Sequence, residues 1–143
     1  MRYVLDTCVV VSALRSRNGA SNRVVRLALL GELPAVCHYK LFAEYRGVLA
    51  RMVTQNQLEY SQKQVDRMLG AMLTVFEEVG VRYLWRPNLP DEGDNFVYET
   101  AFAASPATIV THHLRDFRAP ELHWPGVGVK TPQQILTERT RYA

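Results

Sequence analysis

One acidic residue interrupts an otherwise apolar or small-residue stretch near the start of the chain, Val4-Leu5-Asp6-Thr7-Cys8-Val9-Val10-Val11-Ser12-Ala13-Leu14. Residues 3–5 are β-prone and predict a short strand, whereas residues 8–14 predict a turn or short helix before the polar break at residues 15–19. Asp6 therefore ends the first predicted strand. A single Asp after a strand is also a common turn residue, so its role depends on what the rest of the chain brings to it.

The firmest helix prediction starts with a capping box. Ser61 is followed three residues later by Gln64, and behind them the apolar residues follow one helical face as far as residue 79, where Gly80 is expected to close the helix. The apolar residues of positions 39–53 also recur at three- and four-residue spacing. These two segments predict long amphipathic helices that pack against a common core.

Strand-like and helix-like segments alternate along the remaining sequence. Ser21 is expected to cap a helix that reaches residue 30, and Gly31 is placed to end it. This alternation predicts an α/β fold, a three-layer sandwich with a mostly parallel central sheet flanked by helices. The other expected elements are strands at 35–37, 81–85, 108–111 and 126–129, a loop at 86–93, and helices at 95–104 and after Thr131-Pro132.

Length and composition fit one ordinary globular domain. The chain has 143 residues, of which 48% are hydrophobic and 22% charged, and no repeat or linker divides it, so we expect a single domain over residues 1–143. Cys8 and Cys37 lie in apolar runs and predict buried thiols in a reducing compartment. No signal-peptide or membrane-spanning stretch is indicated, which favours a cytoplasmic protein.

The positive charge is modest but rich in arginine. The formal net charge is +3, and 14 of the 17 basic residues are Arg, a side chain that forks onto phosphate groups. A nucleic-acid partner and codon bias in a GC-rich genome explain this excess equally well. Arg15 and Arg17, in the break after the first strand, are candidate phosphate contacts or simply solvated charges.

Four carboxylates lie at positions in the predicted elements that could contribute to one shared site. Asp6 ends a strand, and Glu44 lies on the apolar face of its helix, where it must be paired or bound to a metal. Asp94 opens the next helix and points inward, although Asp94 or Asp91 could instead cap that helix. Asp116 follows the 108–111 strand and is the least constrained of the four.

Converging carboxylates predict a hard divalent cation. Mg²⁺ and Mn²⁺ favour oxygen ligands and accept substrate phosphates as further ligands, and paired ions activate water for phosphodiester cleavage. The histidines and cysteines show no zinc-site spacing. The sequence also lacks a Gly-rich phosphate loop, a nucleophile-elbow serine and a dinucleotide fingerprint. Kinase, serine hydrolase and dehydrogenase functions are therefore not indicated.

The run from Val4 to Leu14 resembles the opening of PIN domains, in which a strand delivers the first metal-binding Asp and a Thr or Ser follows. The resemblance extends from about residue 3 to residue 136 and is closest to small prokaryotic proteins of the VapC type, the toxin ribonucleases of toxin–antitoxin systems. The later matching segments are Glu44 after the second strand, Asp91-Glu92-Gly93-Asp94 before a helix, Ile109-Val110-Thr111 with Asp116-Phe117, and Thr131-Pro132.

This resemblance implies a magnesium- or manganese-dependent ribonuclease that cleaves single-stranded RNA, forms a homodimer and is inhibited by an antitoxin. In such a site Asp6 and Asp94 would hold the principal cation, Glu44 would orient a metal-bound water, and Asp116 would help a second, weaker ion. The residues that the resemblance implicates are Asp6, Glu44, Asp94 and Asp116 as catalytic and metal-binding groups, and Thr7, Thr111, His113 and Asp91 in support.

The sequence departs from the PIN pattern at two positions. Cys8 stands where relatives often have Asn, and His113 where many have Asp or Asn. His113 could ligate a metal, contact phosphate or weaken the second metal site. Two alternatives to the ribonuclease therefore stay open, a catalytically weak module that binds RNA or an antitoxin, and a DNA nuclease on the same fold.

Overall fold

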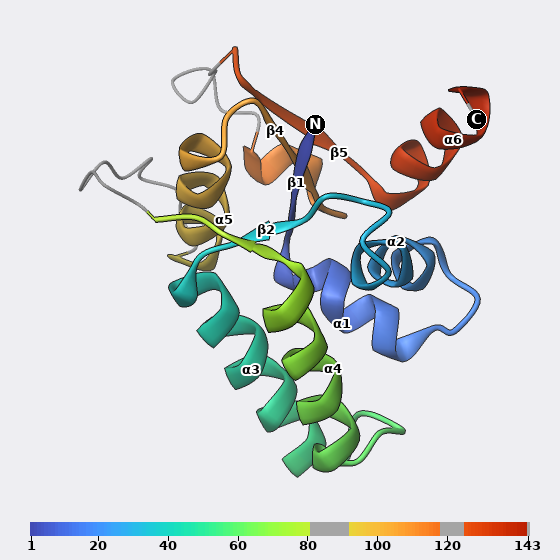
Figure 1. The fold of residues 1–143 in the computed structure, drawn as a ribbon. Coiled ribbons are helices and arrows are strands. Elements are labelled where there is room, and N and C mark those ends of the chain that lie inside the picture. Colours follow the sequence, from blue (N-terminus) through green and yellow to red (C-terminus); the bar gives the residue numbers. More distant parts are fainter. Residues whose placement is uncertain (81–91, 118–124, 143) are drawn as a thin grey trace.

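The computed structural model describes residues 1–80, 92–117 and 125–142 (Figure 1). Helices and strands alternate through these residues. In chain order the elements are β1 (Arg2–Leu5), α1 (Thr7–Arg15), α2 (Ala20–Leu29), β2 (Val36–Cys37), α3 (Tyr39–Thr54), α4 (Gln62–Val75), β3 (Glu77–Glu78), α5 (Glu92–Ala103), β4 (Ala107–Val110), the 3₁₀ helix η1 (Leu114–Phe117), β5 (Val127–Lys130) and α6 (Pro132–Tyr142).

All the strand pairs in the described residues are parallel. β1 pairs with β4 and β4 with β5, while β2 pairs with β3. A bridge between Tyr3 and Ala35, with the Tyr3 amide donating to the Pro34 carbonyl at 2.8 Å, joins the two groups. The strand order is therefore β3–β2–β1–β4–β5. This arrangement confirms the predicted α/β class with a parallel central sheet.

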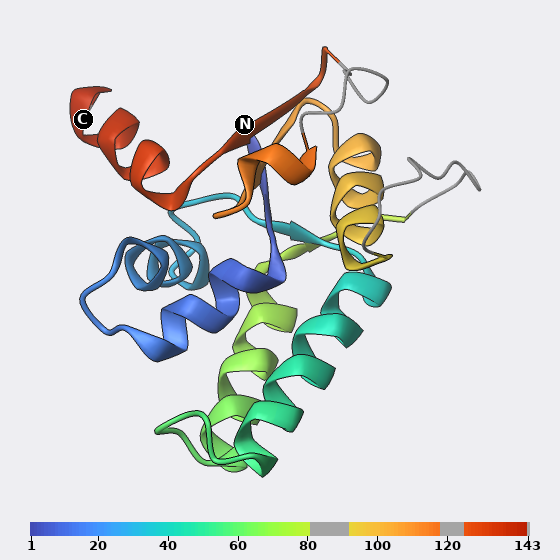
Figure 2. The same ribbon diagram turned by 180° about the vertical axis from the view of Figure 1, so that it is seen from behind.

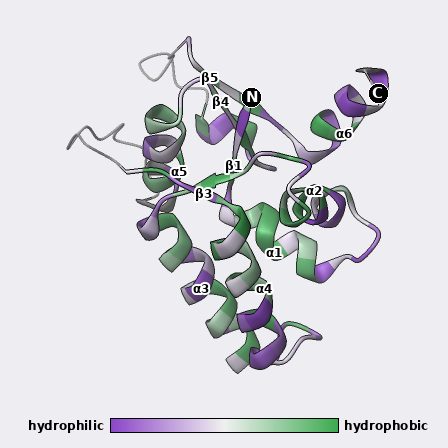
Figure 3. Cartoon of the chain, in the orientation of Figure 1, coloured by the Kyte–Doolittle hydropathy of each residue, from purple (hydrophilic) through white to green (hydrophobic). Residues whose placement is uncertain are grey.

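Helices lie on both sides of the strands. In Figure 1, α5 lies on one side, where it contacts β1 and β4, and α2 and α6 lie on the other side, where they contact each other. The view from behind shows α3 and α4 side by side as a hairpin below the sheet (Figure 2). Figure 3 shows hydrophobic and hydrophilic residues alternating along the helices, as expected of helices that each bury one face. None of the helices in the described ranges is long and apolar enough to cross a membrane.

The capping box at Ser61 is confirmed, but the helix ends earlier than predicted. The Ser61 hydroxyl accepts from the Gln64 amide, and the Gln64 side chain accepts from the Ser61 amide. The helix stops at Val75, because the next residues pair in parallel with β2 as β3. Phe76 and Val79 are buried as predicted, yet they flank an extended segment and not a helix. Pairing with a neighbouring strand overrides the local helical spacing.

Ser21 does not cap α2, contrary to the prediction. Gly19 occupies the N-cap position, and Ser21 is buried inside the first turn, where its hydroxyl lies 2.7 Å from Nε2 of His112. The hydroxyl is therefore used in a tertiary contact and not for its own helix. The predicted helix over 39–53 and the strands over 108–111 and 126–129 are confirmed to within one residue. The strand expected at 81–85 and most of the 86–93 loop lie outside the described residues.

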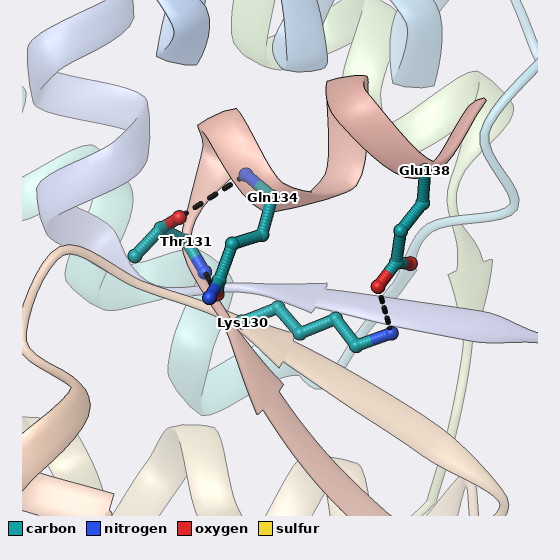
Figure 4. A network of polar contacts seen from close by, with 4 residues as sticks. All are labelled: Lys130, Thr131, Gln134 and Glu138. Carbon is teal, nitrogen blue, oxygen red and sulfur yellow. Dashed lines mark hydrogen bonds and ion pairs between the residues drawn. The ribbon is translucent and has the colours of Figure 1, made fainter. Parts of the chain in front are cut away.

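A second capping box starts α6. The Thr131 hydroxyl accepts from the Gln134 amide at 3.2 Å, and the Thr131 amide donates to the Gln134 side chain at 2.8 Å (Figure 4). Lys130, the last residue of β5, forms an ion pair with Glu138 at 2.6 Å. These contacts fix the direction in which α6 leaves the sheet.

Candidate active site

Asp6 lies at the point where the strand order reverses. From β1 the chain continues to β2 and β3 on one side of the sheet, and β4 then pairs with β1 on its other side. The Asp6 amide donates to the Val110 carbonyl at 2.9 Å, so the ends of β1 and β4 are held together directly at this residue. Open parallel sheets bind ligands at such a switch point, beyond the carboxyl ends of the strands.

The Asp6 side chain faces the end of β4 and does not cap α1. Asp6 occupies the N-cap position of α1, but its carboxylate makes no capping hydrogen bond. Instead Oδ2 accepts from the Thr111 hydroxyl at 2.7 Å and from the Cys8 thiol at 3.3 Å. The residue is only 6% exposed. A buried carboxylate held by donors from two elements is a positioned group, unlike an ordinary turn residue.

Thr111 is the main support of this carboxylate. It is fully buried, and besides donating to Asp6 its hydroxyl accepts from the His113 amide at 3.0 Å. Its own amide donates to the Lys130 carbonyl at 2.9 Å, which ties the residue to the end of β5. The hydroxyl is therefore oriented, with its proton directed to Asp6.

The Cys8 thiol acts as a second donor to Asp6. Burial, together with the charge of Asp6, raises the pKa of this thiol to about 12, so it keeps its proton at neutral pH. The Cys8 sulfur also lies 3.7 Å from the Thr111 hydroxyl. Cys8 and Cys37 are both free, as the sequence predicts, but Cys8 is only partly buried.

Tyr45 contacts the backbone of the residue that precedes Asp6. It lies on α3, is fully buried, and its hydroxyl donates to the backbone carbonyl of Leu5, the residue before Asp6. Burial is the main cause that raises the pKa of the Tyr45 phenol well above its usual value. The charges of Asp6 and Glu44 add to this rise, so the phenol lies within electrostatic range of both carboxylates. Tyr45 thus links α3 to the peptide that carries Asp6.

Removing the Tyr45 hydroxyl is expected to destabilise the fold. Tyr45→Phe leaves the Leu5 carbonyl without this donor, and the free energy of unfolding should fall by about 1–3 kcal/mol, as for other buried groups that lose a partner. Urea unfolding measures the change. Tyr39→Phe is the matched control, because Tyr39 is on the same helix and 65% exposed. Equal unfolding free energies of the two variants would contradict the supporting role of the hydroxyl.

The other three predicted carboxylates are on elements that surround Asp6. Glu44 on α3 and Asp94 in the first turn of α5 are each half-buried, and Asp116 on η1 is exposed. α3 contacts both α1 and α5, and α5 contacts both β1 and η1. Within the described ranges, however, no three His, Cys, Asp or Glu side chains lie close enough together to hold a metal ion. The elements that carry the four carboxylates are thus linked by contacts, but the carboxylates themselves form no closed metal-binding cluster in the described ranges.

The predicted supporting residues differ in their surroundings. The Thr7 hydroxyl, at the start of α1, is buried and has no hydrogen-bond partner among the residues that the structure describes. His113 is exposed, and only its amide takes part in the Asp6 network, through Thr111. Asp91 lies outside the described residues.

Arg15 and Arg17 are farther from Asp6 than the sequence suggested. Residues 7–15 form a helix and not a short turn, so Arg15 in its last turn lies roughly 13 Å along the helix axis from Asp6. Both arginines are exposed, and the Arg17 guanidinium lies 5.8 Å from the centre of the Tyr60 ring.

Residues 2–115 match the family model of the PIN domain, and the chain therefore belongs to the PIN domain family. Among solved structures, the chain is similar to one in the crystal structure of VapBC2 from Rickettsia felis bound to a DNA fragment from their promoter. The two chains superpose with a TM-score of 0.62 at 16% sequence identity, over 92% of this chain and 98% of the other. No curated protein is significantly similar in sequence.

Sequence reasoning did not identify three parts of this site: the Tyr45 hydroxyl, the Cys8 thiol as a donor, and the contact of His112 with Ser21. A signal existed for Tyr45, because a tyrosine within an apolar helical stripe must find a partner for its hydroxyl. Nothing in the sequence pointed to Leu5 as that partner. Cys8 and Ser21 were interpreted from their local context alone.

Proposed function

We propose that this protein is a metal-dependent endoribonuclease that cleaves single-stranded RNA, with Asp6 at the centre of its active site. PIN domains are generally nucleases, and the chain belongs to that family. The observation that carries the proposal is the buried Asp6 carboxylate at the switch point, which makes no capping hydrogen bond to α1 and is held by Thr111. A purely structural turn does not require a buried carboxylate with an oriented hydroxyl donor, whereas a catalytic carboxylate must be held in one orientation.

The residues at this edge fit a hard divalent cation. Both hydrogen bonds to the Asp6 side chain go to Oδ2, so Oδ1 is available as a ligand within the described residues. The buried Thr7 hydroxyl beside it, which lacks a partner in the same part of the chain, suits a metal-bound water. In this proposal Asp6 is the first ligand of Mg²⁺ or Mn²⁺. Glu44 and Asp94, with help from Asp116 on η1, would complete its coordination only when the ion is bound, because the described residues form no closed cluster without it.

When bound, the cation would lower the pKa of a water molecule that it coordinates and would neutralise negative charge on the phosphate. The chain's own residues do the positioning. Thr111 and Cys8 hold the Asp6 carboxylate in one orientation, and Tyr45 fixes the peptide that precedes it. We propose that Glu44 on α3 and Asp94 on α5 contribute the further carboxylates, and that Glu44 orients the attacking water.

Metal removal tests the proposal. Cleavage of labelled single-stranded RNA should need added Mg²⁺ or Mn²⁺ and should stop when EDTA is in excess, because the carboxylates alone activate no nucleophile. The same assay with single-stranded and double-stranded DNA separates a ribonuclease from a DNA nuclease. Cleavage that continues in EDTA, or that acts on DNA alone, would refute the RNA proposal, and no cleavage of any substrate would favour a binding module.

A toxin role with a cognate antitoxin extends this proposal. The similar Rickettsia felis structure is a VapBC2 assembly on promoter DNA, which supports an antitoxin partner and an oligomeric state for this chain as well. We propose that the oligomer includes a homodimer of this chain. The gene beside this one should then encode a short partner protein. Co-expression of the two should yield a complex that cleaves RNA more slowly than the isolated protein, and mass measurement of each sample gives the number of copies.

A further inference from the structure

A basic hollow lies between α2 and α6, away from the carboxylates. Its volume is ≈ 350 Å³, and it is open to solvent on the molecular surface. Apart from the buried Leu136 at its base, its lining is polar and exposed. The lining residues are Arg23 from α2, and Gln133, Leu136, Thr137, Thr140 and Arg141 from α6.

The polar side chains of α6 in this hollow recur at helical spacing. Gln133, Thr137, Thr140 and Arg141 are related by steps of four, seven and eight residues, so they form one continuous face of the helix. Figure 3 shows the hydrophilic character of α6. The Gln133 amide donates to the Thr137 hydroxyl at 3.4 Å and the Thr140 hydroxyl donates to the Leu136 carbonyl at 3.0 Å. The Thr137 hydroxyl and the Arg141 guanidinium are therefore the donors that this helix face offers in the hollow that Arg23 also lines.

The charge around this hollow is not neutralised within the described residues. α2 contains no acidic residue, and the single acidic residue of α6, Glu138, is already paired with Lys130 (Figure 4). Neither Arg23 nor Arg141 forms an ion pair in the part of the chain that the structure describes. Two guanidiniums without ion pairs, together with the Thr137 hydroxyl, suit an oxyanion, above all a phosphate.

Both walls of the hollow begin at the edge of the sheet that carries Asp6. The first turn of α2 is held by the contact of Ser21 with His112, the residue that follows Thr111. α6 follows β5 directly, and the Lys130 carbonyl at the end of β5 accepts from the Thr111 amide. Arg23 is two residues beyond Ser21. The hollow and the candidate active site are therefore positioned by the same strand ends.

We propose that the hollow between α2 and α6 binds a backbone phosphate of the RNA, beside the nucleotide whose phosphate lies at Asp6. This inference rests on the proposed ribonuclease function. Because a phosphate contact reads no base, the hollow adds affinity and register to any single-stranded RNA and no sequence preference. It gives the protein an anchor for the strand that is separate from the carboxylates.

Salt-dependent RNA binding tests the hollow. The Asp6→Asn protein, in which cleavage is suppressed, is titrated with fluorescein-labelled single-stranded RNA between about 50 and 200 mM KCl. Adding Arg23→Ala or Arg141→Ala should weaken binding about three- to tenfold, and each should flatten the slope of log K against log salt. The two substitutions together should flatten it by about 0.7, the value for one phosphate contact on a single strand. Arg23→Lys in the same Asp6→Asn background should keep the salt slope, because the charge is retained, but should bind the RNA more weakly than the Asp6→Asn protein itself.

Arg26→Ala is the matched control, because Arg26 is an exposed arginine of the same helix that does not line the hollow. An equal change of slope for Arg26→Ala, or no change for Arg23→Ala and Arg141→Ala, would overturn the proposal. So would an Arg23-dependent affinity for an acidic peptide with unaltered RNA binding, which indicates a protein partner. Thermal melting checks that these exposed substitutions leave the fold intact.

The two proposals fail in different ways. If the slope responds to Arg23 but the wild-type protein cleaves no RNA, the hollow is an RNA site and the nuclease proposal is wrong. If cleavage depends on Asp6 while the slope ignores Arg23 and Arg141, the nuclease proposal stands and the hollow is refuted.

Discussion

Replacing Asp6 with Asn should lower the rate of RNA cleavage by about a hundredfold or more, because a lost metal-binding charge costs at least what a disturbed supporting residue costs. Asn has nearly the same shape as Asp and still accepts the hydrogen bond from Thr111, so the fold is expected to persist. The negative charge at the switch point is lost. Single-turnover cleavage of labelled single-stranded RNA in Mn²⁺, at saturating protein, measures the effect on the chemical step.

Asp66→Asn is the matched control for this substitution. Asp66 is exposed on α4 and accepts a hydrogen bond from Gln62 at 2.8 Å, so the same chemical change is made at a surface helix position. Its cleavage rate should equal that of wild type. Wild-type rates in both variants would show that Asp6 has no catalytic role, and a large loss in both would indicate a general effect of charge.

Asp6 was recognised from the sequence because its information is local. A strand that ends at an acidic residue places the carboxylate at the loop edge of a parallel sheet, whatever the remaining packing is. The capping box at Ser61 and Gln64 was equally local, since both hydrogen bonds form within one turn. The end of the first strand before Asp6 and this capping box, each determined by a few neighbouring residues, are confirmed.

Features that depend on tertiary partners were the ones predicted wrongly or not at all. The end of α4 is set by β2, a segment roughly forty residues earlier, which draws Glu77 and Glu78 into parallel pairing. The Ser21 hydroxyl contacts His112, which is 91 residues away in the sequence, and therefore does not cap α2. Local propensity is worth only tenths of a kcal/mol per residue, so such contacts override it.

For the carboxylates, the sequence predicted which side of an element each one faces but not how closely they meet. Glu44 stands on the apolar side of α3, beside the buried Tyr45, as its spacing indicated. The separation of Glu44, Asp94 and Asp6 depends on how α3 and α5 pack against β1, and residue spacing contains no such information. His113, the position at which the sequence leaves a second metal site undecided, is exposed.

Thr111→Val is the second change with a large expected effect. Valine has nearly the same shape as threonine, but it removes the donor to Asp6 and the acceptor of the His113 amide from a fully buried position. The free energy of unfolding should fall by about 1–3 kcal/mol, with more if the carboxylate stays charged and poorly partnered. The melting temperature should drop by about 3 °C for each kcal/mol in a chain of this size.

RNA cleavage by Thr111→Val should fall roughly tenfold or more at a temperature where the variant is still folded, since supporting residues of metal ligands typically have effects of that order. Thr111→Ser retains the hydroxyl and should recover most of the cleavage while losing some packing, a split that a merely structural threonine would not produce. Thr108→Val is the control, because Thr108 is a buried threonine of β4, the strand that Thr111 follows, and the described residues show no hydrogen bond between it and Asp6. If Thr111→Ser cleaves as slowly as Thr111→Val, the hydrogen bond to Asp6 does not position the carboxylate for catalysis.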